Sequence, residues 1–104
     1  MTMVNLCPHA IHLNDGRVVD PSGIVARVSS SYTEFDENLV AEVKFGDIQN
    51  LPDPVPGTLY VVSGLVLAAA KDAGRFDCVA PATGHVDCVR DEKGQIKSVP
   101  GFVR

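Results

Sequence analysis

The feature that most constrains the fold is an apolar, largely β-branched run, Thr58–Val62, that leads into a helix-forming segment, Leu65–Lys71. Such a run is typical of a central strand, and leucine, alanine and lysine favour a helix. Ser63 stands where the strand must become the helix, so its hydroxyl is the expected N-cap, and Gly74 is the expected stop. The apolar segment Phe76–Val79 follows and predicts a strand parallel to the first. The sequence therefore predicts a compact strand–helix–strand unit.

Shorter segments before this unit also have the composition of strands. Val4–Cys7 is an apolar run that ends at Pro8, where the chain must leave a regular ladder. Ala10–Leu13 and Arg17–Val19 flank the turn Asn14-Asp15-Gly16, whose Asp-Gly pair supplies the positive φ that a tight hairpin requires. We therefore expect a strand, a kink at the proline and then a β-hairpin.

The chain between this hairpin and the central unit is less regular. Ile24–Ser29 is rich in β-branched residues and alternates, which predicts a strand with its even-numbered positions on one face. The polar run Ser30–Asp36 predicts a loop. Asn38–Phe45 fits a strand or a short helix, and the neighbouring pattern favours a strand. Ile48–Leu51 indicates a further short strand.

The end of the chain predicts a second hairpin. Val86–Arg90 and Gln95–Val99 flank Asp91–Gly94, a four-residue turn with glycine last. A chain of 104 residues fits one domain with one core. The predicted fold is therefore a small α+β domain, mostly strands, with one short helix after a central strand and a C-terminal β-hairpin.

The distribution of charge limits the classes of partner. The formal net charge is -4 and the isoelectric point is about 5.1, whereas proteins that bind duplex nucleic acid carry a clustered basic face. The acids are concentrated between Asn14 and Asp53, and the segment from Pro54 to Arg104 is close to neutral. We therefore expect no binding to duplex nucleic acid, while a small anionic ligand, which needs only a few bases and backbone amides, fits the composition.

Hydropathy and cysteine content indicate the compartment. The apolar stretch Leu59–Ala70 is shorter than the roughly 20 residues that a membrane-spanning helix needs. Met1–Leu6 has neither the positive nor the apolar region of a secretory signal. The odd set Cys7, Cys78 and Cys88 favours reduced thiols. We expect no membrane interaction and a cytoplasmic location.

The turn after Val62 is the strongest candidate binding site. Free amides at a helix N-terminus, on the carboxyl side of a strand, are suited to a phosphate or carboxylate. Arginines elsewhere in the chain supply charge, and Tyr32 supplies a ring for stacking on a base. The predicted ligand-binding residues are Ser63, Gly64, Leu65, Arg27, Arg75, Arg90, Tyr32 and His9.

Two other chemistries have weaker sequence support. Cys7, His9 and His12, with Cys78, His85 and Cys88, are metal-ligating types, but they lack the short paired spacing of structural zinc sites. Val61–Leu65 places Ser63 at a strand-to-helix turn, yet it lacks both glycines of a hydrolase nucleophile elbow. The sequence therefore predicts no metal, no cofactor and no catalytic residue.

Four segments, Val4–Ile11, Pro21–Gly23, Pro56–Ser63 and Val89–Ile96, together resemble a group of small proteins of bacteriophages, prophages and some bacterial genomes. Members of that group often have threonine at the position of Cys7, which weakens a metal role for this cysteine. The resemblance implies a phage setting, in which small acidic proteins act as counter-defence factors. Such factors sequester a nucleotide immune signal or block a host defence protein.

Three functions follow, in order of preference. The first is an oligomeric binding module that sequesters a phosphate-bearing nucleotide signal at the turn after Val62. The second is an inhibitor that presents the acidic half, Asn14 to Asp53, to a host defence protein. The third is a small hydrolase that uses His9, His12 or His85 as a general base near Ser63.

Overall fold

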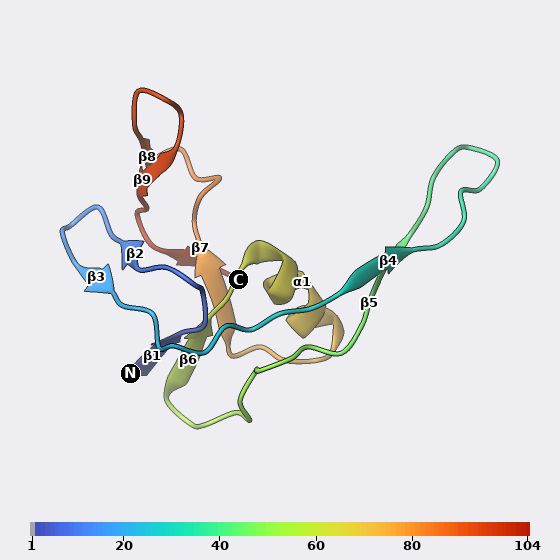
Figure 1. Ribbon diagram of the computed structural model, residues 1–104, viewed down its shortest axis with the longest axis horizontal. Helices are drawn as coiled ribbons and strands as arrows, with labels where there is room; N and C mark the ends of the chain where they lie inside the picture. Colours follow the sequence, from blue (N-terminus) through green and yellow to red (C-terminus); the bar gives the residue numbers. More distant parts are fainter. Residues whose placement is uncertain (1) are drawn as a thin grey trace.

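The computed structural model describes residues 2–104, and within them the fold is built on a four-stranded sheet of order β1-β6-β7-β10 (Figure 1). Three of these strands are parallel, β1 (Thr2–Asn5), β6 (Thr58–Val61) and β7 (Cys78–Pro81). The last strand, β10 (Phe102–Val103), runs antiparallel to β7. Helix α1 (Gly64–Asp72) joins β6 to β7, so the predicted strand–helix–strand unit with parallel strands is confirmed.

Within residues 2–104, three two-stranded antiparallel hairpins extend from this sheet. They are β2 (Ile11–His12) with β3 (Val18–Val19), β4 (Ser30–Tyr32) with β5 (Val43–Phe45), and β8 (Val89–Arg90) with β9 (Ile96–Ser98). The first and the last are the two predicted hairpins. The predicted α+β class, mostly strands with one short helix and a C-terminal hairpin, is therefore confirmed.

The segment between the first hairpin and β6 differs from the prediction. Ile24–Ser29 is not a strand: its ladder contact is a single bridge from Arg27 to Gln49. Its alternating composition fits an extended chain, but no neighbouring strand runs alongside it over several residues. The predicted loop Ser30–Asp36 instead begins with β4, because β5 lies beside it.

Two further expectations for this segment are corrected. Asn38–Phe45 is a strand only over Val43–Phe45, and its first residues form the turn of the β4–β5 hairpin. Ile48–Leu51 forms no strand beyond the bridge at Gln49. In both cases the local composition permits a strand, but a strand forms only where a partner lies at pairing distance.

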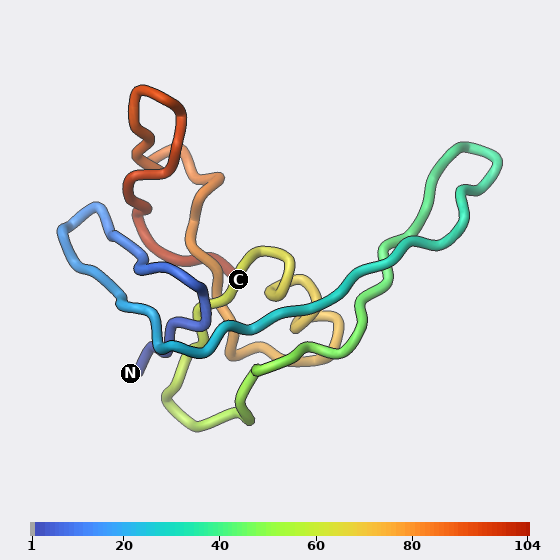
Figure 2. The backbone as a smooth tube through the Cα atoms, viewed as in Figure 1, coloured from blue at the N-terminus to red at the C-terminus, as the bar shows by residue number. Residues whose placement is uncertain are grey.

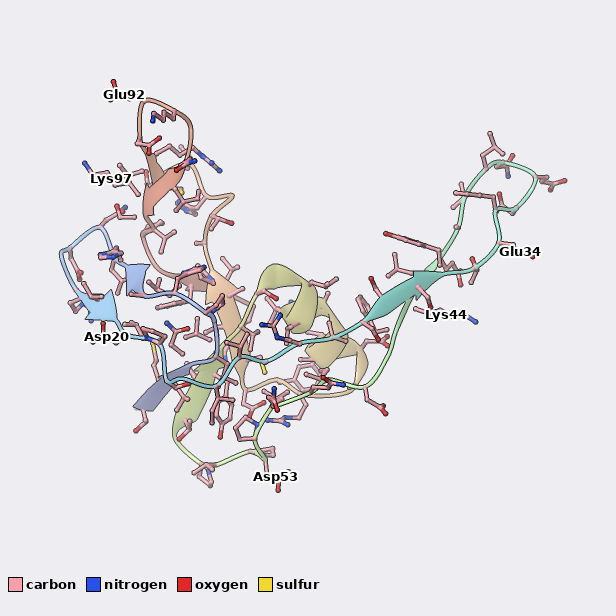
Figure 3. The ribbon with its side chains drawn as sticks, in the orientation of Figure 1. Asp20, Glu34, Lys44, Asp53, Glu92 and Lys97 are labelled. Atoms are coloured by element: carbon pink, nitrogen blue, oxygen red, sulfur yellow. The ribbon has the colours of Figure 1, made fainter. Side chains whose placement is uncertain are left out.

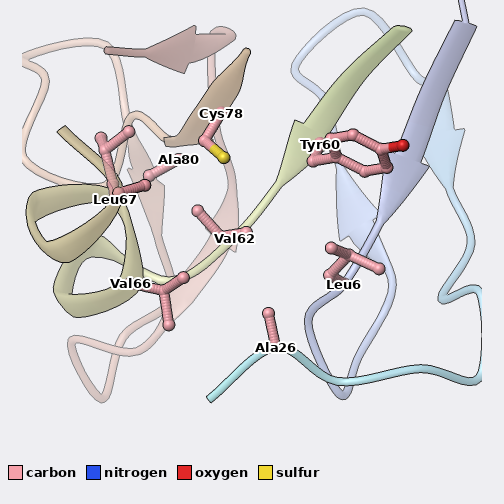
Figure 4. Close-up of a cluster of buried hydrophobic side chains, with 9 residues drawn as sticks. Leu6, Ala26, Tyr60, Val62, Val66, Leu67, Cys78 and Ala80 are labelled. Atoms are coloured by element: carbon pink, nitrogen blue, oxygen red, sulfur yellow. The ribbon is translucent and has the colours of Figure 1, made fainter. Parts of the chain in front are cut away.

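The core lies on both faces of the sheet, which explains why Thr58–Val62 is apolar throughout. Successive side chains of a strand point to opposite faces. Tyr60 and Val62 pack on the helix side (Figure 4). Val61 packs on the other side. The helix-side cluster consists of Leu6, Ala26, Tyr60, Val62, Val66, Leu67, Ala70, Cys78 and Ala80. The opposite cluster consists of Cys7, Ile11, Val61, Val79 and Val99.

In residues 2–104 no helix is long and apolar enough to cross a membrane.

Asn5, at the end of β1, is the buried polar residue that organises the N-terminal half. Its side chain is 1% exposed, and its Nδ2 donates to the carbonyl oxygens of His9 and Val19, each at 3.0 Å. Its Oδ1 accepts the amide of Cys7 at 2.9 Å. The backbone carbonyl of Asn5 accepts both the amide and the hydroxyl of Ser22. One residue therefore joins the end of β1 to the next loop, to β3 and to the chain that follows it.

Arg75 and Asp77 form a second polar anchor, shortly after the C-terminal end of α1. The guanidinium of Arg75 donates from Nε and Nη2 to the two carboxylate oxygens of Asp77, at 2.9 and 2.8 Å. Nη2 also donates to the carbonyl of Pro52 at 2.8 Å. The two side chains are only 21% and 19% exposed, and the hydrogen bonds from Arg75 hold the pKa of Asp77 below its ordinary value.

We predict that Asn5→Asp strongly destabilises the fold. The carboxylate retains the acceptor for Cys7 but loses both donors, and it places a buried charge against two carbonyl oxygens. The expected loss of unfolding free energy is about 3 kcal/mol or more, measured by urea unfolding. Asn50→Asp is the matched control, because that exposed amide makes one bond, to Val25, and should cost less than about 1 kcal/mol. Equal losses in the two variants would contradict the assigned role of Asn5.

We predict that Asp77→Asn lowers stability at neutral pH but much less in acid. Because the pKa of Asp77 is lower in the folded chain than in the unfolded chain, its contribution is complete above the unfolded value, about 3.9. That contribution disappears as the pH falls through the folded value. Urea unfolding should show a difference from the wild type of about 1–3 kcal/mol at pH 7 that shrinks toward pH 3.

The exposed pair of Arg17 and Asp15 supplies the control for this measurement. Its side chains are 77% and 52% exposed, so Asp15→Asn should change stability much less than Asp77→Asn. A difference between wild type and Asp77→Asn that stays constant from pH 7 to pH 3 would show that the Asp77 charge is not what stabilises the fold.

Candidate functional site

The carboxyl ends of the three parallel strands lie at one edge of the sheet. From this edge the chain leaves β1 through the Cys7–Ala10 loop, leaves β6 through Val62 and Ser63, and leaves β7 through Ala82 and Thr83. Ligands of sheets with parallel strands bind outside this edge, because the loops and helix N-termini there are free to contact them. The geometry thus gathers loops from three distant parts of the sequence.

Helix α1 begins at this edge and is capped by Ser63, as predicted. Ser63 is extended, with φ -67 and ψ 162, and its Oγ accepts the amide of Val66 at 3.3 Å. The amides of Gly64 and Leu65 precede the first intrahelical bond, and among residues 2–104 they have no acceptor. The first turn of the helix carries no acidic residue. The helix therefore presents two free donors and the positive end of its dipole to the loops.

A cavity of about 440 Å³ lies beside this helix start. Its volume is in the range of small-molecule sites. It is lined by Cys7, Pro8, His9, Ala10, Ile11, His12, Ser63, Gly64, Pro81, Thr83, Ile96, Lys97, Ser98 and Val99. We call this the edge cavity. It combines apolar walls with a small number of polar groups, as ligand sites do.

The edge cavity has a charge character opposite to that of the whole chain. The chain has a formal net charge of -4, yet among residues 2–104 no aspartate or glutamate lines this cavity. Its titratable side chains other than Cys7 are Lys97, which extends outward from the C-terminal hairpin in Figure 3, and the imidazoles of His9 and His12. Lys97 and the free amide of Gly64 at the start of α1 are donors suited to an anion.

Pairing between two hairpins brings Lys97 and His12 to the same cavity. The amide of Val99 donates to the carbonyl of His12 at 3.0 Å, and the amide of Asn14 donates to the carbonyl of Val99 at 2.9 Å. The hydroxyl of Ser98 is 2.6 Å from Oδ1 of Asn14. These bonds hold the end of β9 against the end of β2. The bonded residues Ser98 and Asn14 are 84 positions apart in the sequence.

Ser63 also borders a second cavity, of about 360 Å³, which shares Cys7 and Pro8 with the edge cavity. Among its lining residues are Val25, Arg27, Val28 and Leu65, and Arg27 is the charged one within the described chain. The predicted ligand-binding residues thus divide into two groups. His9, Ser63 and Gly64 meet at the edge cavity, and Arg27, Ser63 and Leu65 meet at the second cavity.

Three predicted residues lie elsewhere. Arg75 follows the C-terminal end of α1 and is engaged by Asp77 and Pro52. Arg90 is bonded within its hairpin to the carbonyl of Gly94 and also to that of Thr83. Tyr32 is on β4, in the hairpin that projects away from the four-stranded sheet (Figures 1 and 2). None of these three lines the edge cavity.

Cys7, His9 and His12 line the edge cavity, whereas Cys78, His85 and Cys88 lie elsewhere in the fold. None of the three cysteines, all in the described chain, forms a disulfide, and residues 2–104 hold no group of three or more potential metal ligands. Burial raises the pKa of the thiols of Cys7 and Cys78, so both are held as neutral thiols. Ser63 Oγ is bonded to the Val66 amide, and no imidazole of the described chain is hydrogen bonded to it. This geometry offers no activated nucleophile.

The predicted ligand-binding set omits Lys97, Thr83 and His12, although His12 is among the candidate metal ligands and general bases named from the sequence. Each lies outside any local motif: His12 and Lys97 are on short hairpin strands and Thr83 is in the turn after β7. The sequence shows that these residues are polar, but only the contact between β2 and the end of β9 places two of them together.

No protein-family model, curated protein or solved structure matches this chain. The edge cavity, through its volume, its lining residues and the free amide of Gly64, is therefore the feature of this chain that indicates a function.

We predict that Ser63→Ala destabilises the protein by about 1 kcal/mol, because it removes the acceptor for the Val66 amide at the helix N-terminus. Ser63→Asp should preserve the stability, since aspartate is also a preferred N-cap and its charge favours the helix dipole. Thermal or urea unfolding of both variants checks the assignment. Equal destabilisation by alanine and aspartate would show that Ser63 does not act as a cap.

Proposed function

We propose that this chain is a binding protein for a small anionic ligand, which it holds in the edge cavity with a phosphate or carboxylate at the start of α1. The observation that carries the proposal is the absence of any carboxylate from the cavity lining within residues 2–104, in a chain with four more acids than bases. Lys97, two imidazoles and Gly64, whose amide is free, all border this one cavity. An anion gains from the lysine and the free amide, and no carboxylate of the described residues opposes it in the cavity lining.

The lining residues of the cavity support a ligand that has both an anionic group and an apolar or aromatic part. Ile11, Pro81 and Ile96 contribute apolar surface, and the hydroxyls of Thr83 and Ser98 contribute polar groups. A phosphate-bearing nucleotide has this composition. The resemblance of the chain to small phage proteins supports the narrower proposal that the protein sequesters a nucleotide immune signal and so acts against host defence.

Sequestration fits this site better than hydrolysis. A hydrolase requires a nucleophile activated by a base, or a metal that activates water. Ser63 is committed to its cap and both buried thiols are neutral. The lining residues offer donors for binding, and we assign them no chemical step.

Binding can be tested by native mass spectrometry and calorimetry with AMP, ADP-ribose and a panel of cyclic nucleotides as probes. The protein should retain one ligand per edge cavity. Lys97→Glu should weaken binding by at least about tenfold, because it replaces the lysine of the cavity with a negative charge. Ser63→Asp should also abolish binding, since it places a carboxylate at the anion position while the helix remains capped.

Lys93→Glu is the matched control for Lys97→Glu. Both lysines are exposed and belong to the same C-terminal hairpin region, and the two variants have the same net charge, but Lys93 lies in the turn and does not line the cavity. Lys93→Glu should therefore bind like the wild type. Retention of no probe at micromolar protein, or equal weakening by the two lysine variants, would contradict the proposed site.

A further inference from the structure

The second cavity, of about 360 Å³, adjoins the edge cavity at the start of α1 and shares Cys7, Pro8 and Ser63 with it. The two cavities border different faces of the sheet. The edge cavity contacts the opposite cluster through Ile11, whereas the second cavity contacts the helix-side cluster through Val66. We call the second cavity the helix-side cavity. The shared residues therefore lie between two cavities at the carboxyl edge of the sheet.

Arg27 is the charged residue that lines the helix-side cavity within the described chain. Its backbone is fixed on two sides. The Arg27 amide donates to the carbonyl of Gln49 at 3.0 Å, and the Arg27 carbonyl accepts the Gln49 amide at 2.7 Å. The preceding residue, Ala26, packs in the helix-side cluster and donates its amide to the carbonyl of Leu6 at 3.0 Å (Figure 4). The extended segment Ile24–Ser29 thus holds Arg27 beside the start of α1.

The guanidinium of Arg27 makes no hydrogen bond and no ion pair with residues 2–104. Three other arginines are engaged within the chain: Arg17 and Arg75 are held by carboxylates, and Arg90 is held by two carbonyl oxygens. Leu65, whose amide is free, also borders the helix-side cavity. This cavity therefore has a cation and a backbone donor that the described chain leaves available to a ligand.

Among the described residues, no aspartate or glutamate lines either of these two cavities. Other cavities of the chain differ in this respect. A third cavity, of about 390 Å³, lies at the C-terminal end of α1 and is lined by Asp47 and Asp72, and its one base, Arg75, is held in an ion pair. The two cavities at the start of α1 thus each combine a base, Lys97 or Arg27, with the absence of an opposing acid.

We infer, on the basis of the proposed function, that the ligand carries two separated phosphate groups and spans both cavities. One phosphate lies beside Lys97 in the edge cavity, and the other lies beside Arg27 in the helix-side cavity. A ligand with one phosphate leaves the base of one cavity unused, whereas a ligand with two gains from both. The phosphates belong to different parts of the ligand, because Ser63 lies between the two cavities. A dinucleotide has this composition.

Calorimetry with two matched pairs of probes tests this ligand class. AMP and cyclic AMP carry one phosphate, whereas adenosine 3′,5′-bisphosphate and cyclic di-AMP carry two phosphates that are separated by a ribose. All four probes contain the same base. In each pair, the probe with two phosphates should bind at least about tenfold more tightly than the probe with one. Native mass spectrometry should show one molecule of cyclic di-AMP per chain.

Substitution of Arg27 locates the second phosphate. Arg27→Gln should weaken the binding of both two-phosphate probes by at least about tenfold and leave AMP and cyclic AMP within about twofold of the wild type. Arg27→Lys keeps the charge and should weaken the two-phosphate probes less than Arg27→Gln does. Because the guanidinium has no partner in the described chain, neither variant should change thermal unfolding. Lys97→Glu should weaken all four probes, because it acts at the first phosphate.

Arg17→Gln is the matched control for Arg27→Gln. It removes the same charge from an exposed arginine that lines neither cavity, so it should bind all four probes like the wild type. Equal weakening of the two-phosphate probes by Arg17→Gln and Arg27→Gln would show that overall charge sets the affinity, and it would overturn the inference.

The same titrations separate a failure of this inference from a failure of the proposed function. One-phosphate probes that bind through Lys97, with two-phosphate probes that bind no more tightly, would overturn the inference and leave the proposed function standing. A gain in affinity that survives Arg27→Gln would also overturn it. So would two molecules of cyclic di-AMP per chain, because the cavities would then bind separate ligands. Binding of none of the four probes would overturn both.

Discussion

The N-terminal half of this protein depends on the carboxamide of Asn5. Buried polar groups in folded proteins are almost always hydrogen bonded. Asn5 is only 1% exposed, and both of its Nδ2 donors and its Oδ1 acceptor have partners. The bonds end β1, shape the loop that carries His9 and fix β3 beside it. Since His9 and the neighbouring Cys7-Pro8 turn line the edge cavity, the position of the cavity wall follows from this one side chain.

The acidic β4–β5 hairpin and the edge cavity lie in different parts of the fold. Parallel strands bring their loops to one edge, where the amides of α1, Lys97 and two imidazoles form a carboxylate-free cavity among the described residues. Four acids and a set of exposed apolar side chains lie instead within residues 30–45. These residues form the β4–β5 hairpin and its loop, which project away from the sheet (Figure 1). Acidic side chains repel an anionic ligand. Because the acidic hairpin lies away from the edge cavity, its charges do not oppose anion binding there.

Elements whose signals are local could be predicted from the sequence. The Ser63 cap, the strand before it and the two hairpins with Asp-Gly and Asp91–Gly94 turns depend on residues within a few positions of each other. Ile24–Ser29 has a strand-like composition of equal clarity but lacks a neighbour to pair with over its length, and so it is an extended segment. Whether a segment pairs depends on residues far away in the sequence, and the composition of the segment itself does not describe them.

The candidate site shows the same division. The sequence by itself determined that a capped helix start with free amides follows a central strand, because the capping hydroxyl, the apolar run and the helix formers are contiguous. Only the tertiary structure decided which charges accompany it. Arg75 is drawn into an ion pair with Asp77, while Lys97 and His12 reach the cavity through bonds between β2 and the end of β9. Such choices depend on long-range packing, whose geometry is set by the whole chain and not by any one segment.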